Sequence, residues 1–252
     1  MASGHPIQII PVCGLPEIRP GDDLTALISS CTREQNCPVL QSDIFVVAQK
    51  IVSKAEGRIV RLETVMPSAT AFDWAERWGK DPRIVELVLR ESKSILRMER
   101  GIIVSETRHG FVCANAGVDA SNAGEDMAIL LPESPDDSAC LLRSGLEQSF
   151  GVSVGVIVSD TFGRAWREGL VNVALGVSGI AALIDYRGKR DGDGKLLTAT
   201  IIAAADEIAS AAELVMGKAD LIPVAIVRGF TPGAPPGTGR DLIRPAERDL
   251  FR

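Results

Sequence analysis

The chain has 252 residues, of which 46% are hydrophobic and 24% are charged, so a globular protein of this length can bury a sizeable core. Its formal net charge of -6 disfavours a general polyanion-binding surface, so we expect no nucleic-acid partner. No apolar run approaches the roughly 18 residues needed to span a membrane, and the N-terminus lacks the pattern of a secretion signal. We therefore expect a cytoplasmic protein without a membrane partner.

The first half of the chain predicts strands and helices in irregular alternation. Asp22 is placed to cap the first helix, and Pro82 suits the first turn of a later one. In chain order, the expected elements are a strand at 7–12, a helix at 22–31, a buried strand at 44–49 that runs on into 50–62, helices at 68–79 and 82–96, and a hairpin at 101–117 that turns at 108–110.

The second half continues this mixture. The expected elements are a strand at 128–132, an amphipathic helix at 134–151, a very hydrophobic strand at 152–160, an apolar stretch broken by glycines at 167–186, a charged loop at 187–195, a strand leading into a helix at 198–217, and a last buried strand at 222–230. Because no regular βαβ period is present, we expect an α+β or mixed α/β fold with mixed sheets and flanking helices. One domain at 7–230, with room for two subdomains, would precede a Pro/Gly/Arg-rich tail or linker at 231–252.

The number and spacing of cysteines and histidines limit the kinds of catalytic and metal site that the chain can form. Five widely spaced cysteines without a C-x-x-C pair fit a reduced, cytosolic protein. The two histidines are His5 and His109, so a histidine-based mechanism would depend on His109, and a zinc site would lack ligands. A bound metal would have to be held by carboxylate and hydroxyl oxygens, which favours magnesium, manganese or calcium.

Two strand ends carry oxygen-bearing side chains. Asp119 and Asn122 lie in a loop of small residues after a strand, and Asp160 and Thr161 end another strand. Short loops at strand ends let backbone amides and oxygen ligands approach a phosphate or a cation. Two aspartates that converge from separate strands would bind a hard divalent ion well. The alternative is that each aspartate only caps a turn or a helix.

Cationic residues near these strand ends are candidates for anion binding. Lys50 and Lys54 lie on or after the strand at 44–49, where both could reach phosphate oxygens or could simply face solvent. Arg164 and Arg167 could bind an anionic substrate or form surface ion pairs of little energetic value. The proline-rich loop at 14–23 could wrap a base or a ribose, or be only a turn. From the residues alone, the sequence favours a metal-assisted enzyme that handles phosphate.

Long stretches of the chain resemble the coenzyme F420-0:γ-glutamyl ligase family. The matching text is GLPEIRPGDDL, DIFVVAQKIVSKAEGR, NAGVDASN, GVIVSDTFGRAWREG, ADEIASAAELVMGKAD and IPVAIVRGF, and it spans about residues 7–230. The resemblance implies a GTP-dependent ligase that joins L-glutamate to coenzyme F420-0 and then extends a γ-linked glutamate tail. It also implies two magnesium or manganese ions, assistance by potassium, and an F420 ligase-type fold in an intertwined homodimer.

The same resemblance implies roles for individual residues. Asp119 and Asp160 would hold the first metal ion, and Thr161 would contribute to the second. Contacts to GTP would fall on Leu15, Pro16, Glu17, Ile18, Gln49, Lys50, Lys54, Asn122, Met216, Gly217, Lys218, Ala219 and Asp220. Asp119, Asp160, Lys50, Lys54 and Arg164 would assist the chemistry, in which the F420-0 carboxylate attacks the γ-phosphate of GTP and the glutamate amine then attacks the acyl phosphate.

One position departs from the family pattern. Archaeal-type members carry a glutamate metal ligand where this chain has Lys218, and a protonated lysine cannot ligate a metal. Either another carboxylate, such as Asp220 or Glu207, serves instead, or Lys218 takes part in neutralising phosphate. Lysine here resembles the actinobacterial two-domain form, whose ligase domain precedes a flavin-binding, nitroreductase-like domain, and residues 241–251 resemble its junction. Whether the chain is a stand-alone ligase or part of a longer one stays open.

Two other functions fit the same residues. A metal-dependent nucleotide phosphohydrolase would use the aspartates and lysines without any ligation step. A non-catalytic module that binds GTP or F420 would explain the lysine at position 218. The length of the matching motifs favours the ligase over both.

Overall fold

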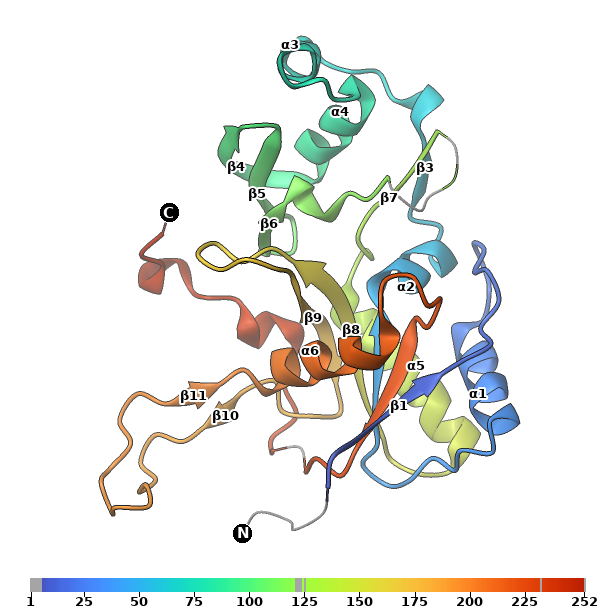
Figure 1. The fold of residues 1–252 in the computed structure, drawn as a ribbon, viewed down its shortest axis with the longest axis vertical. Helices are drawn as coiled ribbons and strands as arrows, with labels where there is room; N and C mark the ends of the chain where they lie inside the picture. The colour runs from blue at the N-terminus through green and yellow to red at the C-terminus, as the bar shows by residue number, and fades with distance from the viewer. Residues whose placement is uncertain (1–5, 121–123, 125, 232, 252) are drawn as a thin grey trace.

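The computed structural model describes residues 6–120, 124, 126–231 and 233–251. A five-stranded sheet with helices on both faces forms the main body, and a smaller three-stranded sheet with two helices lies beside it (Figure 1). The expected mixture of sheets and flanking helices is confirmed. Within the described residues, no helix has the length and apolar character required to cross a membrane.

The main sheet brings two strand ends to one edge. Its strand order is β1 (Gln8–Val12), β12 (Val224–Arg228), β2 (Ile44–Ala48), β8 (Gly155–Phe162) and β9 (Val171–Ser178). β2 and β8 are parallel, with Ala48 opposite Ser159, whereas all other neighbours are antiparallel. The carboxyl ends of β2 and β8 therefore lie together, which is where open sheets of this kind place their ligands.

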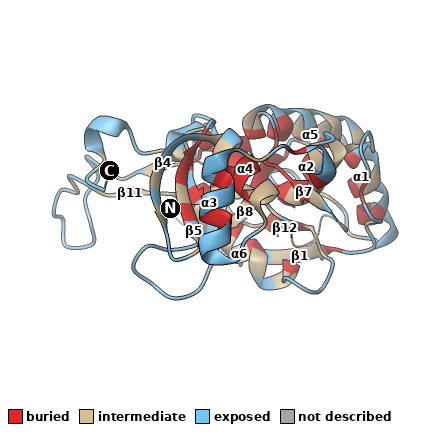
Figure 2. Cartoon of the chain, turned by 90° about the horizontal axis from the view of Figure 1, so that it is seen from above, coloured by how far each residue is buried: buried red, intermediate tan, exposed pale blue. Residues whose placement is uncertain are grey.

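The central strand β2 is buried on both faces. Phe45 and Val47 pack with α1 (Leu24–Glu34) and α5 (Pro135–Phe150), and Ile44 and Val46 pack with α6 (Ala204–Met216). A strand covered on both sides needs apolar residues at consecutive positions, not at alternate ones. This double burial explains the uninterrupted run of apolar residues in the sequence, and Figure 2 shows buried residues concentrated at the centre of the molecule.

The first helix is capped one residue later than the sequence predicted. The Asp23 carboxylate accepts the Ala26 N–H at 3.0 Å, so Asp23 is the N-cap of α1. Asp22 instead accepts the Arg19 N–H at 2.7 Å and closes the preceding turn. Aspartate suits both positions, so the local sequence alone could not distinguish them.

The expected continuation of β2 into residues 50–62 is wrong. The chain turns directly into α2 (Gln49–Ala55), and only β3 (Ile59–Arg61) is extended, paired with β7 (Met127–Ile129). Ile51, Val52 and Ala55 join the cluster beneath α1 and α5, and their spacing gives one face of a helix. β-branched residues suggested a strand here, but tertiary packing decided otherwise.

The smaller lobe contains α3 (Ala69–Trp78), α4 (Pro82–Glu91), β4 (Ser92–Glu99), β5 (Ile102–Thr107) and β6 (Val112–Ala114). Its core joins Trp74, Val88 and Ile103. The helix predicted to reach residue 96 ends at Glu91, because Ser92 starts the strand that pairs with β5. The Ser92 hydroxyl donates to the Val88 carbonyl at 2.6 Å, a side-chain bond that competes with helix continuation. The hairpin turning at 108–110 is confirmed.

The remaining segments lie at the periphery. β10 (Ile184–Asp185) and β11 (Ile201–Ile202) form a ribbon whose connecting residues include the expected charged loop at 187–195 (Figure 1). Three short 3-10 turns are η1 (Leu62–Thr64), η2 (Asn115–Gly117) and η4 (Ala246–Arg248). A fourth, η3 (Gly239–Leu242), packs against β9 so closely that a Cβ at Gly239 would collide with the Leu175 carbonyl oxygen. Glycine is therefore required at that position.

Candidate active site

Two segments meet at the carboxyl edge of β2 and β8. β8 ends in Asp160, Thr161 and Phe162, and β2 leads into α2, whose first residues are Gln49 and Lys50. The pairing of β8 with β9 shifts register between Val158 and Ser159, immediately before Asp160. Such irregularities re-aim the side chains that follow them and are frequent beside active sites. The parallel pairing thus places an aspartate and a lysine from distant parts of the sequence at one edge.

Asp119 joins this edge from a third segment. Its backbone forms two hydrogen bonds with Ile129, at 2.9 Å and 2.8 Å, which fix its position after η2. The Lys50 Nζ lies 2.6 Å from the Asp119 Oδ2, and both side chains are about a quarter exposed. An ion pair this accessible is worth about 1 kcal/mol or less. Both groups can therefore exchange this contact for a charged ligand at little cost.

Among the carboxylates of the described residues, Asp160 has the environment least favourable to its charge. Its pKa is raised to about 6, chiefly by burial and to a smaller extent by the negative charge of Asp119. The backbone N–H of Thr161 and the ammonium groups of Lys218 and Lys50 act in the opposite direction. Strongly perturbed carboxylates of this kind gather at functional sites. The structure therefore brings Asp119, Asp160, Lys50 and Lys218 into one electrostatic cluster.

A polar network adjoins this cluster. The Lys218 Nζ donates to the Thr161 Oγ1 and lies 3.3 Å from the Glu213 Oε1. The Thr161 hydroxyl donates to the Asn172 Oδ1 at 2.6 Å, and the Asn172 Nδ2 donates to the Glu213 Oε2 at 2.8 Å. The network therefore links the end of β8, its partner strand β9 and the last turn of α6.

The carboxylate beside Lys218 is one that the sequence reasoning missed. Within the described residues, Glu213 is the acidic side chain within 4 Å of the Lys218 ammonium, whereas Asp220 and Glu207 are not. Asp220 folds over Gly217, where its carboxylate blocks the space of a Cβ. Glu207 belongs to the first turn of α6, about two helical turns from Glu213. Nothing in the local sequence marks this network, because it depends on the register that pairs Thr161 with Asn172 across β8 and β9.

The loop at 14–18 lies beside α2. Lys54 forms an ion pair with Glu17, and Ile18 is buried in the core with Leu15 packed against it. Pro16 is exposed. Gln49 is buried, and its Oε1 accepts the Ser53 hydroxyl at 2.7 Å. The side chains of Ile18 and Gln49 are thus already occupied in the fold, while Glu17 and Lys54 lie nearer the surface.

The other residues expected to contact the nucleotide differ in how exposed they are. Met216 is buried at the end of α6, whereas Lys218, Ala219 and Asp220 are exposed. Asn122 lies outside the described residues. Arg164 is exposed and donates to the carbonyl oxygens of Glu168 and Gly169, so its guanidinium closes its own loop. The structure shows no contact between Arg164 and the cluster of Asp119 and Asp160.

The donor atoms present fit a divalent cation that is shared with a substrate. Asp119 and Asp160 offer carboxylate oxygens, the ligands that magnesium and manganese prefer. The Thr161 hydroxyl adds a further oxygen, which already accepts from Lys218 and donates to Asn172. In the described part of the chain, no three His, Cys, Asp or Glu side chains gather to form a complete protein cage. Magnesium characteristically binds one or two carboxylates and completes its coordination with water and substrate phosphates. The burial that raises the pKa of Asp160 also leaves its charge poorly solvated, as a cation-binding carboxylate would be.

Comparisons with known proteins agree with the resemblance in the sequence. The family model described as F420-0:Gamma-glutamyl ligase matches residues 13–229. The coenzyme F420:L-glutamate ligase of Methanothermobacter thermautotrophicus is 49% identical over 98% of this chain and 99% of its own length. Those of Methanopyrus kandleri and Methanocaldococcus jannaschii are 48% and 47% identical, over 98% and 85% of this chain and 98% and 86% of their own lengths. The chain belongs to the F420-0:γ-glutamyl ligase family.

Proposed function

We propose that this chain is a GTP-dependent ligase that adds L-glutamate to coenzyme F420-0 and extends the product with γ-linked glutamates. The observation that carries the proposal is the cluster of Asp119, Asp160, Lys50 and Lys218 at the carboxyl edge of β2 and β8. Its mixture of carboxylates and ammonium groups suits phosphoryl transfer. The names of the nearly full-length relatives support the substrates.

Ligation requires an activated carboxylate, because a carboxylate and an amine do not condense in water unaided. A carboxylate oxygen of F420-0 attacks the γ-phosphorus of GTP, and the bond to the β,γ-bridging oxygen breaks, releasing GDP. The glutamate amine then attacks the acyl carbon, and phosphate departs as the amide forms and the amine loses a proton. Lys50 and Lys218 would neutralise the phosphoryl oxygens during the first step, and their contacts with Asp119 and Thr161 support this role.

Divalent cations are part of the proposal. Asp119 and Asp160 would hold one magnesium or manganese ion, and Thr161 would contribute to a second. Such an ion, when bound, neutralises phosphate charge and orients the γ-phosphoryl group. Glu213 and Asn172 hold the Thr161 hydroxyl and the Lys218 ammonium in place around that position. Assistance by potassium and an intertwined homodimer are further predictions from the family resemblance.

Mass analysis of the products tests the function directly. The protein is incubated with F420-0, GTP, manganese, potassium and L-glutamate, and we expect products that differ in mass by successive glutamate residues. Release of phosphate from GTP at the same rate with and without L-glutamate, and without product, would instead favour a phosphohydrolase. Tight binding of the deazaflavin without turnover would favour a non-catalytic module. Omitting GTP, manganese or potassium singly tests each requirement.

A further inference from the structure

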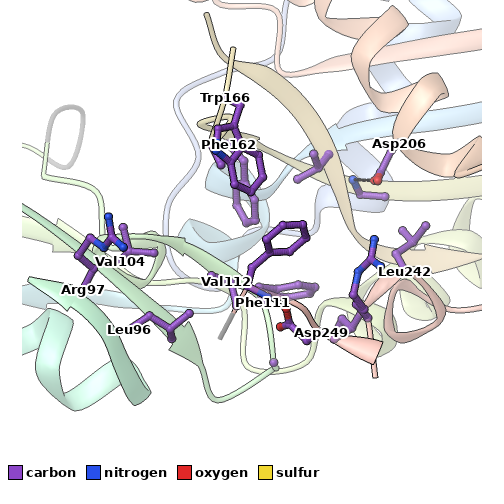
Figure 3. A pocket seen from close by; sticks show the side chains of 17 residues that line it. Leu96, Arg97, Val104, Phe111, Val112, Phe162, Trp166, Asp206, Leu242 and Asp249 are labelled. Atoms are coloured by element: carbon purple, nitrogen blue, oxygen red, sulfur yellow. Dashed lines mark hydrogen bonds between the residues drawn. The ribbon is translucent and has the colours of Figure 1, made fainter. Parts of the chain in front are cut away.

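A large cavity opens beside the cluster, at the end of β8. It has a volume of about 730 Å³, within the size range of small-molecule sites. Its walls come from the β4–β6 sheet, the β8–β9 end and the segment after η3, as Figure 3 shows. None of the roles assigned to the nucleotide, the metal ions or the phosphoryl cluster uses this cavity.

Aromatic rings dominate one part of the cavity. Phe111 and Phe162 pack edge to face, with ring centroids 6.5 Å apart, and Trp166 and Phe251 form a tilted pair at 5.0 Å. Trp166 is 76% exposed and Phe251 is 64% exposed. Large aromatic side chains held this far out of the core leave flat apolar surfaces open to a ligand. The lining is therefore suited to a planar, multi-ring group.

Two cations accompany these rings. Arg97 and Arg244 line the same cavity, as do Asp206 and Asp249, but in the described part of the chain neither guanidinium forms an ion pair with a carboxylate. Other arginines of the protein, such as Arg58 and Arg228, are committed to ion pairs. An arginine is an effective donor to phosphate oxygens because its fork of N–H groups matches their geometry. The cavity thus offers a site for an anionic group next to a site for a ring.

The strand geometry connects this cavity with the phosphoryl cluster. Asp160 and Phe162 are two residues apart in β8, where the pairing with Val173 and Val171 is regular. Residues two apart point to the same face of a strand, about 7 Å from each other along it. A ligand whose ring rests against Phe162 therefore has its arm within reach of Asp160.

We propose that this cavity binds the acceptor substrate, with its deazaflavin ring among Phe162, Trp166 and Phe251 and its phosphodiester against Arg97 and Arg244. The inference rests on the proposed function and adds a location and an orientation to it. The carboxylate arm of the acceptor then points along β8 toward the cluster of Asp119 and Asp160. The two guanidinium groups without an ion pair and the direct connection through β8 favour this occupant over a second copy of the chain.

Fluorescence titration of two deazaflavins separates the ring site from the anion site. F420-0 and the corresponding deazaflavin riboside, which lacks the phosphate, are titrated against the protein in the presence of GDP, so that no turnover occurs. We expect Trp166→Ala to weaken both ligands about tenfold, the effect of losing one stacked ring, and Trp166→Phe to retain most of the affinity. Trp78→Ala, at the exposed end of α3, is the matched control and leaves both affinities unchanged.

Arginine variants probe the anionic group. We expect Arg97→Gln together with Arg244→Gln to weaken F420-0 about tenfold while the riboside is unaffected. Arg77→Gln, an exposed arginine of α3, controls for a general loss of positive charge. Unchanged affinity of both ligands in the Trp166 and arginine variants would overturn the inference, and so would a change in oligomeric state in place of affinity. Failure of the proposed function would give a different result: F420-0 would bind the wild-type protein but would not be ligated to glutamate.

Discussion

The pKa values of carboxylates in the smaller lobe and in the main body are shifted in opposite directions. In the smaller lobe, the pKa of Asp81 is lowered by hydrogen bonds from Arg83, and the pKa of Glu86 is lowered by hydrogen bonds from Ser68 and Arg90. At the edge of β2 and β8, burial raises the pKa of Asp160 to about 6. The charges of Asp81 and Glu86 are stabilised by hydrogen bonds within the protein. The charge of Asp160 is tolerated at a cost to the ligand-free fold, which is the pattern expected of a functional group.

This contrast predicts that removing Asp160 affects activity and not stability. We expect Asp160→Asn to lower the rate of glutamate ligation by about 10³-fold or more, because charge stabilisation at the transferring phosphoryl group is lost. Product formation from F420-0 is followed by mass analysis, and thermal unfolding is measured in parallel. A variant that ligates at a near-normal rate would remove Asp160 from the mechanism. A variant that is too unstable to assay would contradict the expectation that Asp160 serves activity and not stability.

A comparison of two lysines of α2 sharpens the boundaries of the functional region. Lys50 contacts Asp119 within the cluster, whereas Lys54 contacts the exposed Glu17. We expect Lys50→Gln to lower kcat about 10²-fold and Lys54→Gln to act mainly on the KM for GTP, by a smaller factor. Steady-state kinetics with varied GTP measures both. Equal losses of kcat in the two variants would show that the cluster extends to Lys54.

The network around Lys218 should contribute less than the cluster itself. Glu213→Gln removes the charge that holds Lys218 and weakens the contact with Asn172. We expect about a tenfold loss of kcat/KM, because the loosened groups position the site and do not react. Glu207→Gln, which changes an exposed residue in the first turn of the same helix, is the matched control. If both variants behave alike, the network has no role in positioning.

In the smaller lobe we expect a carboxylate substitution to affect stability and not activity. Asp81 caps α4 by accepting the Arg83 N–H at 2.8 Å, so Asp81→Ala should cost about 1 kcal/mol of stability at neutral pH and leave ligation unchanged. Folding lowers the pKa of Asp81. The contribution of this carboxylate to stability is therefore fully present at pH values above its pKa in the unfolded chain, and it is lost as the pH falls through its pKa in the folded protein.

Urea unfolding of Asp81→Ala and the wild type measures this difference at about pH 7 and again at about pH 3. The difference between the two proteins should be smaller at the lower pH than at the higher one. Asp73→Ala, an exposed aspartate of α3, is the control. A difference that is the same at both pH values would mean that the carboxylate charge of Asp81 does not stabilise the cap.

Much of the fold was accessible from the sequence, because most elements are marked by local signals. Gly79 and Gly151 end α3 and α5 with a positive φ, as predicted for helix C-terminal glycines. The errors arose where local signals were ambiguous. Ile51 and Val52 suit a strand or a buried helix equally, and only their packing beneath α1 and α5 made residues 49–55 helical.

The candidate site was predictable to the extent that its residues lie in distinctive motifs. Asp119 and Asp160 were singled out because one follows a strand and the other ends a strand, and the structure places them in one cluster. Glu213 and Asn172 carry no motif of their own. Their positions depend on the register of β9 against β8 and on how α6 packs across it, which are long-range properties of the fold. The aromatic cavity depends in the same way on segments far apart in the sequence.

The hydrogen bonds of Asp136 have a consequence for how the cavity is closed. Its Oδ1 accepts the Val177 N–H at 2.9 Å and the Gly239 N–H at 2.6 Å, so one oxygen atom holds both β9 and η3 against the start of α5. Leu242 and Phe251, which follow Gly239, form part of the cavity wall. Occupancy of the cavity and the rate of amide hydrogen exchange in this segment are therefore thermodynamically linked, and a filled cavity should slow exchange far from the reacting atoms.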